Sequence, residues 1–376
     1  MVDNEKGGSA MNRLIRWHSG IVIVLISIFG LSGCDKALDI WQVYDKRCAL
    51  LYAYQNVPGD ASIVPLPIRH CFDYGICPAW SRASKKCGYV DMMGWFVIAP
   101  QFDNAEPFSE GRAVVRTQGA DGIIDTAGRW IVRPQYPYIC EQSEGMSVYG
   151  EGNDPLRYGY LDCEGKIAIK AMYIEAHRFS DGVALVSEVD YKHTYYIDHR
   201  GDIRIRLPEG AEDADDFHQG LAAIMYWDDS KEKMKYGFIS TTGELVIPAK
   251  FTSVGYFQEG LAPVSMTDSS LFRVSMCFAA QEERSGEWGF IDREGVVVVP
   301  MIFQKLGVLS EGLARYWENG KWGYVNREGK TIIPPQFVVA GDFEGGMAEI
   351  VLNGFYAYID RSGKVVIRTT RQAIEL

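Results

Sequence analysis

The chain has 376 residues, of which 47% are hydrophobic, 12% aromatic and 23% charged, and 39 are glycine. This composition is typical of a globular protein with a substantial core, built either from a few ordinary domains or from one array of repeats. The formal net charge of -11 excludes nucleic acid from the expected partners, because proteins that bind a phosphate backbone need a positively charged surface.

Residues 1–33 are predicted to be a signal peptide. Arg13 and Arg16 supply a cationic start, and the apolar run from Ile21 to Leu31 follows them. This run is shorter than the roughly 20 residues that a membrane-spanning helix needs, and it has the length of a signal-peptide hydrophobic region. Met11 is an alternative start of the protein, so residues 1–10 do not enter the prediction of the fold.

The sequence Leu31-Ser32-Gly33-Cys34 resembles the lipobox of bacterial lipoproteins. This resemblance implies that Cys34 is diacylated and becomes the mature N-terminus, which would anchor the protein in a membrane because two acyl chains bind stably. Asp35 resembles the signal that retains lipoproteins on the periplasmic face of the inner membrane in Gram-negative hosts. The alternative is a buried N-terminal helix with an incidental cysteine.

Residues 34–86 are predicted to form a lipidated, cysteine-rich cap. Cys48, Cys71, Cys77 and Cys87 crowd into residues 48–87, and a short segment with little core of its own is typically stabilised by disulfides in an exported protein. Two disulfides are therefore predicted among these four cysteines, with three connectivities left open. A zinc site is the alternative, although the spacing contains no C-x-x-C pair.

A repeat occupies residues 87–367. A turn glycine recurs in the pattern [WY]-G-[YF]-[IV]-D-x-x-G, and a second glycine follows in an aromatic-x-[ED]-G context, 17 residues later in six units and 19 in another. The first glycines are Gly94, Gly128, Gly165, Gly201, Gly243, Gly295, Gly329 and Gly363, and the second are Gly111, Gly145, Gly182, Gly220, Gly260, Gly312 and Gly346. A constant spacing inside the unit, with the insertions elsewhere, indicates a structural module with permissive loops.

Each unit is predicted to contain a strand, a tight turn and a returning strand. Residues 322–326 (WGYVN) suit a pleated surface, Asn326 opens the turn, and Gly329 supplies its positive φ. Pro334 and Pro335 are expected to end the returning strand, because they have no amide hydrogen to donate. An extended segment held by two aromatic residues, a Glu-Gly turn and a short strand complete the unit.

These motifs resemble the WG-repeat family of bacterial proteins, although Trp-Gly itself survives only at Trp288-Gly289 and Trp322-Gly323. The expected fold is all-β, a curved β-solenoid with residues 34–86 as its cap and 368–376 as a short tail. The alternative is a ring like a β-propeller. The solenoid is favoured because the repeat is shorter than the roughly 40 to 50 residues usual for a blade. A ring would also leave unmatched ends unless residues 48–86 supplied the missing strands.

The repeated aspartates are expected to accept backbone amides in their turns, and no catalytic residue is predicted. Four histidines lie in the third and fourth units (His177, His193, His199 and His218), near the acidic stretch from Glu209 to Asp216. Their spacing matches no metal-binding motif, and the chain contains no phosphate-binding loop, dinucleotide fingerprint or nucleophile elbow. No metal site and no cofactor are therefore predicted.

The expected function is that of a non-catalytic envelope lipoprotein, which binds a protein partner through its repeats. A second hypothesis is binding of a cell-wall glycan or peptide by recurring Trp and Tyr side chains, which are alternatively the core of each repeat. A metal-dependent enzyme that uses the histidine-rich middle units is the third.

Overall fold

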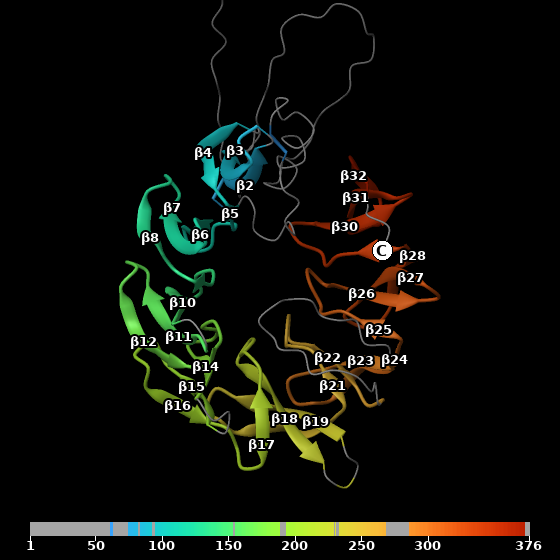
Figure 1. Ribbon diagram of the computed structural model, residues 1–376. Coiled ribbons are helices and arrows are strands. Elements are labelled where there is room, and N and C mark those ends of the chain that lie inside the picture. The colour runs from blue at the N-terminus through green and yellow to red at the C-terminus, as the bar shows by residue number, and fades with distance from the viewer. Residues whose placement is uncertain are drawn as a thin grey trace, which may run out of the picture.

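The computed structural model describes residues 61–62, 74–81, 83–91, 95–152, 155–188, 193–228, 230, 233–267 and 286–372. In those ranges every regular element is a β-strand, and the strands form eight sheets of four. The strands of each sheet are consecutive and antiparallel, and we number the sheets as blades 1–8 in chain order. Figure 1 shows the blades following one another around a ring, with the last returning toward the first.

Each blade contains four strands, and the same position has a similar length in most blades. The first strands lie toward the centre of the ring (Figure 1): β1 (Ala61–Ser62), β5 (Asn104–Ala105), β9 (Tyr138–Ile139), β13 (Glu175–Ala176), β17 (Ala211–Ala214), β21 (Ser253–Val254), β25 (Lys305–Leu306) and β29 (Val339–Ala340). The second strands are β2 (Ile76–Ser81), β6 (Arg112–Thr117), β10 (Met146–Glu151), β14 (Ala184–Ser187), β18 (Leu221–Asp228), β22 (Ala262–Ser265), β26 (Leu313–Glu318) and β30 (Met347–Leu352). The third strands are β3 (Lys86–Asp91), β7 (Ala120–Asp125), β11 (Arg157–Asp162), β15 (Thr194–Ile197), β19 (Lys233–Ser240), β23 (Trp288–Ile291), β27 (Lys321–Asn326) and β31 (Phe355–Asp360). The fourth strands form the outer rim (Figure 1): β4 (Phe96–Phe102), β8 (Trp130–Tyr136), β12 (Ile167–Tyr173), β16 (Ile203–Arg206), β20 (Leu245–Phe251), β24 (Val297–Phe303), β28 (Thr331–Phe337) and β32 (Val365–Gln372).

The fold is an eight-bladed β-propeller, and the predicted curved solenoid is wrong. The strands that a ring would otherwise lack come from β1 and β2, which pair with each other and with β3 in blade 1. The expected boundary between cap and array at residues 86 and 87 therefore falls inside β3. A ring of blades covers both faces of every sheet with a neighbour, which leaves the innermost and outermost strands of each blade as edges.

The repeat seen in the sequence spans two blades. It begins with the third and fourth strands of one blade and continues directly into the first strand of the next, as from β4 through Asp103 to β5. The link from a fourth strand to the next first strand is one residue at six boundaries, and this explains the constant spacing of the two glycines. At the boundary of blades 4 and 5 the link is residues 207–210, and there the spacing is 19. The other variable connections join a second strand to a third strand, outside the unit.

The glycine of the Trp-Gly pair makes room for a bulge in the neighbouring outer strand. Two shifts of register separate β27 from β28 around Gly323. A Cβ atom at Gly323 would lie 2.5 Å from the carbonyl oxygen of Ile333 and 2.7 Å from the nitrogen of Pro335. Blade 4 has Tyr195 at this position, and its shorter outer strand pairs with Tyr195 and the next residue without a shift. The bulge occurs with glycine in six blades, and blade 8 has a register shift beside Ala357.

Pro334 and Pro335 do not end the returning strand, as was predicted, but lie inside β28. The strand can accommodate them because it is the outermost of its blade and one of its edges has no partner strand. Both prolines also lie in the bulge opposite Gly323, where the regular ladder is interrupted.

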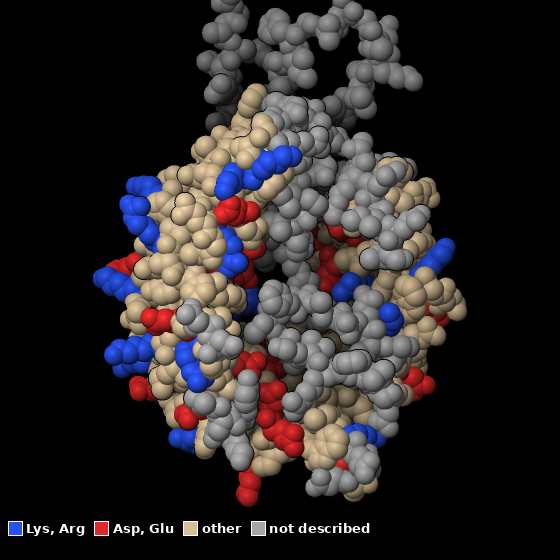
Figure 2. Space-filling view, in the orientation of Figure 1, with Lys and Arg blue, Asp and Glu red and all other residues tan. Residues whose placement is uncertain are grey.

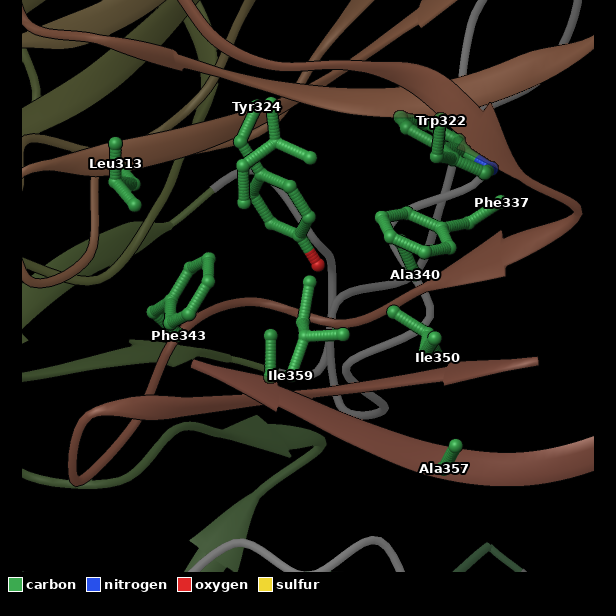
Figure 3. Close-up of a cluster of buried hydrophobic side chains, with 11 residues drawn as sticks. Leu313, Trp322, Tyr324, Phe337, Ala340, Phe343, Ile350, Ala357 and Ile359 are labelled. Atoms are coloured by element: carbon green, nitrogen blue, oxygen red, sulfur yellow. The ribbon is translucent and has the colours of Figure 1, made fainter. Parts of the chain in front are cut away.

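Recurring aromatic residues join each blade to the next. Figure 3 shows the boundary of blades 7 and 8, where Tyr324 and Phe337 of one blade pack with Phe343 of the other. The hydroxyl of Tyr324 donates a hydrogen bond to the carbonyl oxygen of Gly341 at 2.7 Å. Equivalent bonds run from Tyr89 to Glu106 at 2.7 Å, from Tyr160 to His177 at 2.8 Å and from Tyr196 to Asp215 at 2.5 Å. These side chains form the core between blades.

The predicted role of the repeated aspartates is confirmed. One carboxylate oxygen of Asp125 accepts the amides of Ala127 and Arg129 at 3.0 and 2.9 Å. The same pattern recurs at Asp162, Asp198, Asp292, Asn326 and Asp360. Burial alone would raise the pKa of Asp125, but hydrogen bonds from the amide and side chain of Arg129 and from Ala127 together lower it. These residues are structural.

Candidate functional site

The propeller has two faces of different construction. One, which we call the turn face, carries the turns between first and second strands and the D-x-x-G turns between third and fourth strands. Contacts between distant turns place both kinds on this face: the Arg112 side chain donates to the Cys163 carbonyl at 3.1 Å, and a ring nitrogen of His199 lies 3.0 Å from the Glu144 carbonyl oxygen. The other, the loop face, carries the connections between second and third strands and the links between blades.

A chain of hydrogen bonds runs around the turn face. The Glu110 carboxylate accepts the amides of Glu144 and Gly145 in the next blade at 2.7 and 2.8 Å. Corresponding bonds of 2.7 to 2.9 Å lead from Gly182 to Glu144, Gly220 to Asp181, Gly260 to Gln219, Gly312 to Glu259 and Gly346 to Glu311. The acceptor residues themselves have φ near +50°, so a strained backbone is stabilised by the neighbouring blade.

The chain of bonds is interrupted at blade 1. Its turn holds Tyr74 where the other blades have Glu, Asp or Gln, and Tyr74 lies against the aromatic ring of Phe108 at a centroid distance of 6.3 Å. Blade 8 has Gly345 at the same position, which offers no side-chain acceptor. Blade 1 is thus joined to its neighbours differently from the other seven.

The connections on the loop face vary in length in a regular order. Blades 2, 7 and 8 use tight turns with positive φ at both residues: Gln118-Gly119, Asn319-Gly320 and Asn353-Gly354. These suit a two-residue hairpin. The longer connections belong to blade 1, from Ser81 to Lys86, and to blades 3 to 6, from Glu151 to Arg157, Ser187 to Thr194, Asp228 to Lys233 and Ser265 to Trp288. Four adjacent blades therefore share one elaborated half of the loop face.

Acidic side chains are concentrated near the first strand of blade 5. Figure 2 shows Asp and Glu beside the central opening and over the part of the ring that holds β17. Glu212 and Asp213 of that strand are exposed. This charge fits the overall excess of acidic residues and indicates a surface that repels anions.

One of the four predicted histidines lies in a group of carboxylates. His177 is buried at the boundary of blades 4 and 5, where its Nδ1 lies 2.8 Å from a carboxylate oxygen of Asp216 and its Nε2 lies 3.6 Å from one of Glu175. The hydrogen bond to His177 lowers the pKa of Glu175. Both ring nitrogens thus face acids, an arrangement that joins two blades.

The other histidines do not join this group. His199 stacks on Phe179 in a turn at a centroid distance of 4.1 Å, and His218 lies 4.4 Å from the ring of Tyr256. His193 precedes β15 on the opposite face. Among the described residues, no three side chains of His, Cys, Asp or Glu are grouped as a metal ion would require.

Asp215, next to Asp216, is a buried carboxyl. Burial raises its pKa to about 6, and the negative charge of Asp216 adds to the rise. The folded protein therefore holds this proton at a pH where an unfolded aspartate, with a pKa of about 4, has lost it. The free energy of unfolding therefore falls as the pH rises from about 4 to about 6, and this loss of stability persists at higher pH.

Asp215→Asn is expected to raise the free energy of unfolding at pH 8 by about 1 to 2 kcal/mol. The substitution removes the buried charge and keeps an oxygen for the Asp216 amide, now bonded at 2.8 Å. The gain should shrink as the pH falls from 6 toward 4. Urea unfolding at several pH values measures it, with the exposed Asp213→Asn as the control. An equal gain at every pH would contradict this account.

Several predicted sites lie outside the described residues. These are the lipidation residue Cys34, the sorting residue Asp35, and the candidate disulfide cysteines Cys48 and Cys71. The signal peptide and the anchor stay predictions from the sequence. The described ranges contain no helix able to cross a membrane.

Cys77 and Cys87 lie on paired strands of blade 1. Cys77 is opposite Val90, and Cys87 is opposite Trp80, so the two cysteines project from opposite faces of the sheet. A disulfide between them does not fit this register, and a bond of either would have to involve Cys48 or Cys71. Burial raises the pKa of the Cys87 thiol. The disulfides remain a prediction.

The recurring aromatic residues are buried. Tyr324, Phe290 and Phe238 have no exposed surface, and Trp322 and Trp288 retain 4% and 8%. They cannot line a binding face while the blades are packed. The features of the two faces were not visible in the sequence, because the carboxylate–amide hydrogen bonds of the turn face and the group around His177 join residues of different blades. The Glu-Gly motif was the one sequence pattern that marked the turn face.

The sequence matches the family described as "WG containing repeat" at residues 88–119, 122–153, 158–192, 236–268, 288–322 and 322–354. Most of these stretches begin in a third strand and end near the second strand of the next blade, as the structural unit does. A search of curated protein sequences found no significant match.

Among solved structures the chain is similar to a eukaryotic initiation factor, with 11% identity, a TM-score of 0.45 and coverage of 76% of this chain and 94% of that chain. It is similar to the Dos1 propeller, with 12% identity, a TM-score of 0.41 and coverage of 70% and 83%. It is also similar to hydrazine synthase of Kuenenia stuttgartiensis, with 10% identity, a TM-score of 0.35 and coverage of 69% and 93%.

Proposed function

The chain belongs to the family of proteins with WG-containing repeats, and from that premise we propose that it is a non-catalytic, lipid-anchored scaffold that binds another protein through its loop face. The single observation that carries the proposal is the elaboration of one half of that face. Connections longer than a tight turn occur in the four adjacent blades 3 to 6 and in blade 1, whereas blades 2, 7 and 8 have two-residue turns. Binding residues are typically placed on variable loops that a rigid framework holds.

The turn face is less suited to this role. Its carboxylates accept amides of the next blade, and its arginines and His199 reach neighbouring turns. Groups that are already hydrogen-bonded inside the protein contribute little to a partner, because binding would have to break these bonds first. The turn face therefore serves to hold the blades in register.

The arrangement of the polar groups supports a binding function over catalysis. His177 faces Asp216 and Glu175 across a blade boundary, and the recurring aspartates accept backbone amides in their turns. The recurring aromatic residues are in the core, which removes the main support for glycan binding by an aromatic surface. A protein partner fits best, since propellers without a chemical site present their loops as a broad platform.

The proposed location rests on the sequence around Cys34. Diacylation at this residue would hold the propeller at a cell membrane, and Asp35 would keep it at the periplasmic face of the inner membrane in a Gram-negative host. Residues 35–60 would then connect the anchor to blade 1.

Shortening the four long connections is expected to reduce recovery of the partner at least about tenfold. Each connection is replaced by Asn-Gly, the turn that blades 7 and 8 use, so that the paired ends Glu151 and Arg157, or Asp228 and Lys233, can close a regular hairpin. The tagged protein is extracted from membranes, and copurified proteins are identified and quantified by mass spectrometry.

The matched control alters the turn face. Glu164, Glu294 and Glu328 are exposed residues of D-x-x-G turns, and their replacement by alanine should leave recovery unchanged. If the shortened variant retained the partner, or if the turn-face variant lost it, the loop face would not be the binding surface.

A further inference from the structure

The boundary of blades 2 and 3 departs from the rest of the core at four equivalent positions of the repeat. At the boundary of blades 7 and 8 these positions hold Trp317, Trp322, Phe337 and Leu352, which pack in one apolar cluster. At the boundary of blades 2 and 3 they hold Arg116, Asp121, Tyr136 and Glu151. Trp317 and Trp322 are directly paired across two strands, and so are Arg116 and Asp121. An ion pair therefore replaces a pair of indoles.

The ion pair of Arg116 and Asp121 is fully hydrogen-bonded inside the protein. Asp121 is 6% exposed and accepts two hydrogen bonds from the Arg116 guanidinium at 2.6 and 3.0 Å. Its second oxygen also accepts the amide of Ile139 at 3.0 Å, and Arg116 donates to the Pro137 carbonyl at 2.9 Å. Such a bidentate pair needs no further partner and carries no net charge.

An open cavity of about 510 Å³ lies beside this boundary on the loop face. Its lining consists of Gly119, Ala120, Gln135, Tyr136, Pro137, Glu151 and Gly152. Phe337, the counterpart of Tyr136, is 3% exposed inside the apolar cluster, where Figure 3 shows it beside Trp322. Tyr136 is instead half-buried, with its ring 4.8 Å from that of Tyr149. Tyr136 packs against the apolar cluster of Val132, Ile139 and Tyr149, and it also forms part of the cavity lining.

The chemistry of the lining selects a class of ligand. Among the described residues of the lining, Glu151 is the one with a charge, and it is exposed, so this lining favours a cation over an anion. Burial raises the pKa of Tyr136, with a contribution from the charge of Glu151, so the phenol stays neutral and available for hydrogen bonding. Ala120, Pro137 and the tyrosine ring add an apolar wall that suits an aliphatic stem.

We infer that this cavity binds an alkylammonium group, an amine at the end of an aliphatic chain, with Glu151 as its ion-pair partner and Tyr136 as a hydrogen-bonding neighbour. The group can belong to a free amine or to a lysine side chain of a polypeptide. The site shares Glu151 and Gly152 with the blade 3 connection of the proposed binding face. It goes beyond the proposed scaffold function, because it would bind a small probe without any partner protein.

Saturation-transfer NMR with the whole protein tests this site. The probes are pentane-1,5-diamine, which is a free amine, and Nα-acetyl-lysine methylamide, which carries the same group on a peptide backbone. Both are expected to bind, and an ammonium supplied only by a polypeptide would give a signal for the second alone. Either result supports the site. Pentanol and pentanoate, which are neutral and anionic, should bind at least about tenfold more weakly.

Three variants distinguish the site from general attraction to an acidic protein. Glu151→Gln should weaken binding of the amines at least about tenfold, and Tyr136→Phe about threefold. Glu318→Gln is the matched control, because Glu318 occupies the same position at the end of β26 and lines no part of this cavity. It should bind like the unaltered protein. Absence of saturable binding, equal binding of pentanol, or an equal loss in Glu318→Gln would overturn the inference.

Discussion

Gly323→Ala is expected to lower the free energy of unfolding by about 3 kcal/mol. The added methyl group would meet the backbone of Ile333 and Pro335 at 2.5 and 2.7 Å, and backbone of a paired strand cannot move aside as a flexible side chain can. The outer strand would have to separate from its blade or lose its bulge. Urea-induced unfolding followed by tryptophan fluorescence measures the loss.

Blade 8 provides the control for this substitution. It has Ala357 at the equivalent position, paired with Arg368, and the register shift of this blade lies just before it, between Phe355 and Ala357. Ala357→Gly should cost about 1 kcal/mol or less, mainly through the added freedom of the unfolded chain. A loss for Gly323→Ala no larger than that for Ala357→Gly would show that the glycine is not required by the bulge.

Cys34→Ala is expected to abolish acylation and membrane association completely. The lipobox resemblance gives the precursor only one acceptor for the lipid, and without its acyl chains a propeller of this kind has no strong hold on a bilayer. Metabolic labelling with a palmitate analogue, followed by membrane fractionation, measures both effects. The precursor should also keep its signal peptide.

Cys163 supplies the matched control, because it is an exposed thiol in a turn of blade 3. Cys163→Ala should be labelled and fractionated like the unaltered protein. Labelling that persists in Cys34→Ala would mean that this cysteine is not the lipid attachment site, and the proposed anchor would then have to be abandoned.

The parts of the fold that could be predicted are those set by neighbours in the sequence. Asn326 and Gly329 were correctly assigned to their turn because side chain, backbone and turn lie within four residues of one another. The constant spacing of the repeat glycines was also readable. It reflects two strands and a link without a loop, and the length of such a unit is fixed by its pairing.

Closure of the ring could not be predicted in the same way. The missing strands of blade 1 lie in residues 61–81, where Tyr74-Gly75 replaces the Glu-Gly motif and hides the repeat. Whether repeats form a ring or an open solenoid depends on the angle between successive blades. Many contacts between blades, such as that of Tyr324 with Gly341, together determine this angle. No single unit shows this angle in its sequence.

The sites were hidden for a related reason. Arg116 and Asp121 look like two ordinary surface charges in the sequence, and their meaning appears only when they are compared with Trp317 and Trp322 at equivalent positions. The grouping of His177 with Asp216 likewise joins two blades. The three-dimensional partners of residues that depart from the repeat could not be read from one chain.

The central claim is that the loop face of blades 3 to 6 binds the partner while the turn face holds the ring together. Hydrogen–deuterium exchange of the purified complex, compared with the protein alone, tests it most directly. Slower exchange is expected in peptides that include the connections 151–157, 187–194 and 228–233, with no change in the D-x-x-G turns. Protection of the turns at Asp162, Asp292 and Asn326, with unchanged loop connections, would contradict the account.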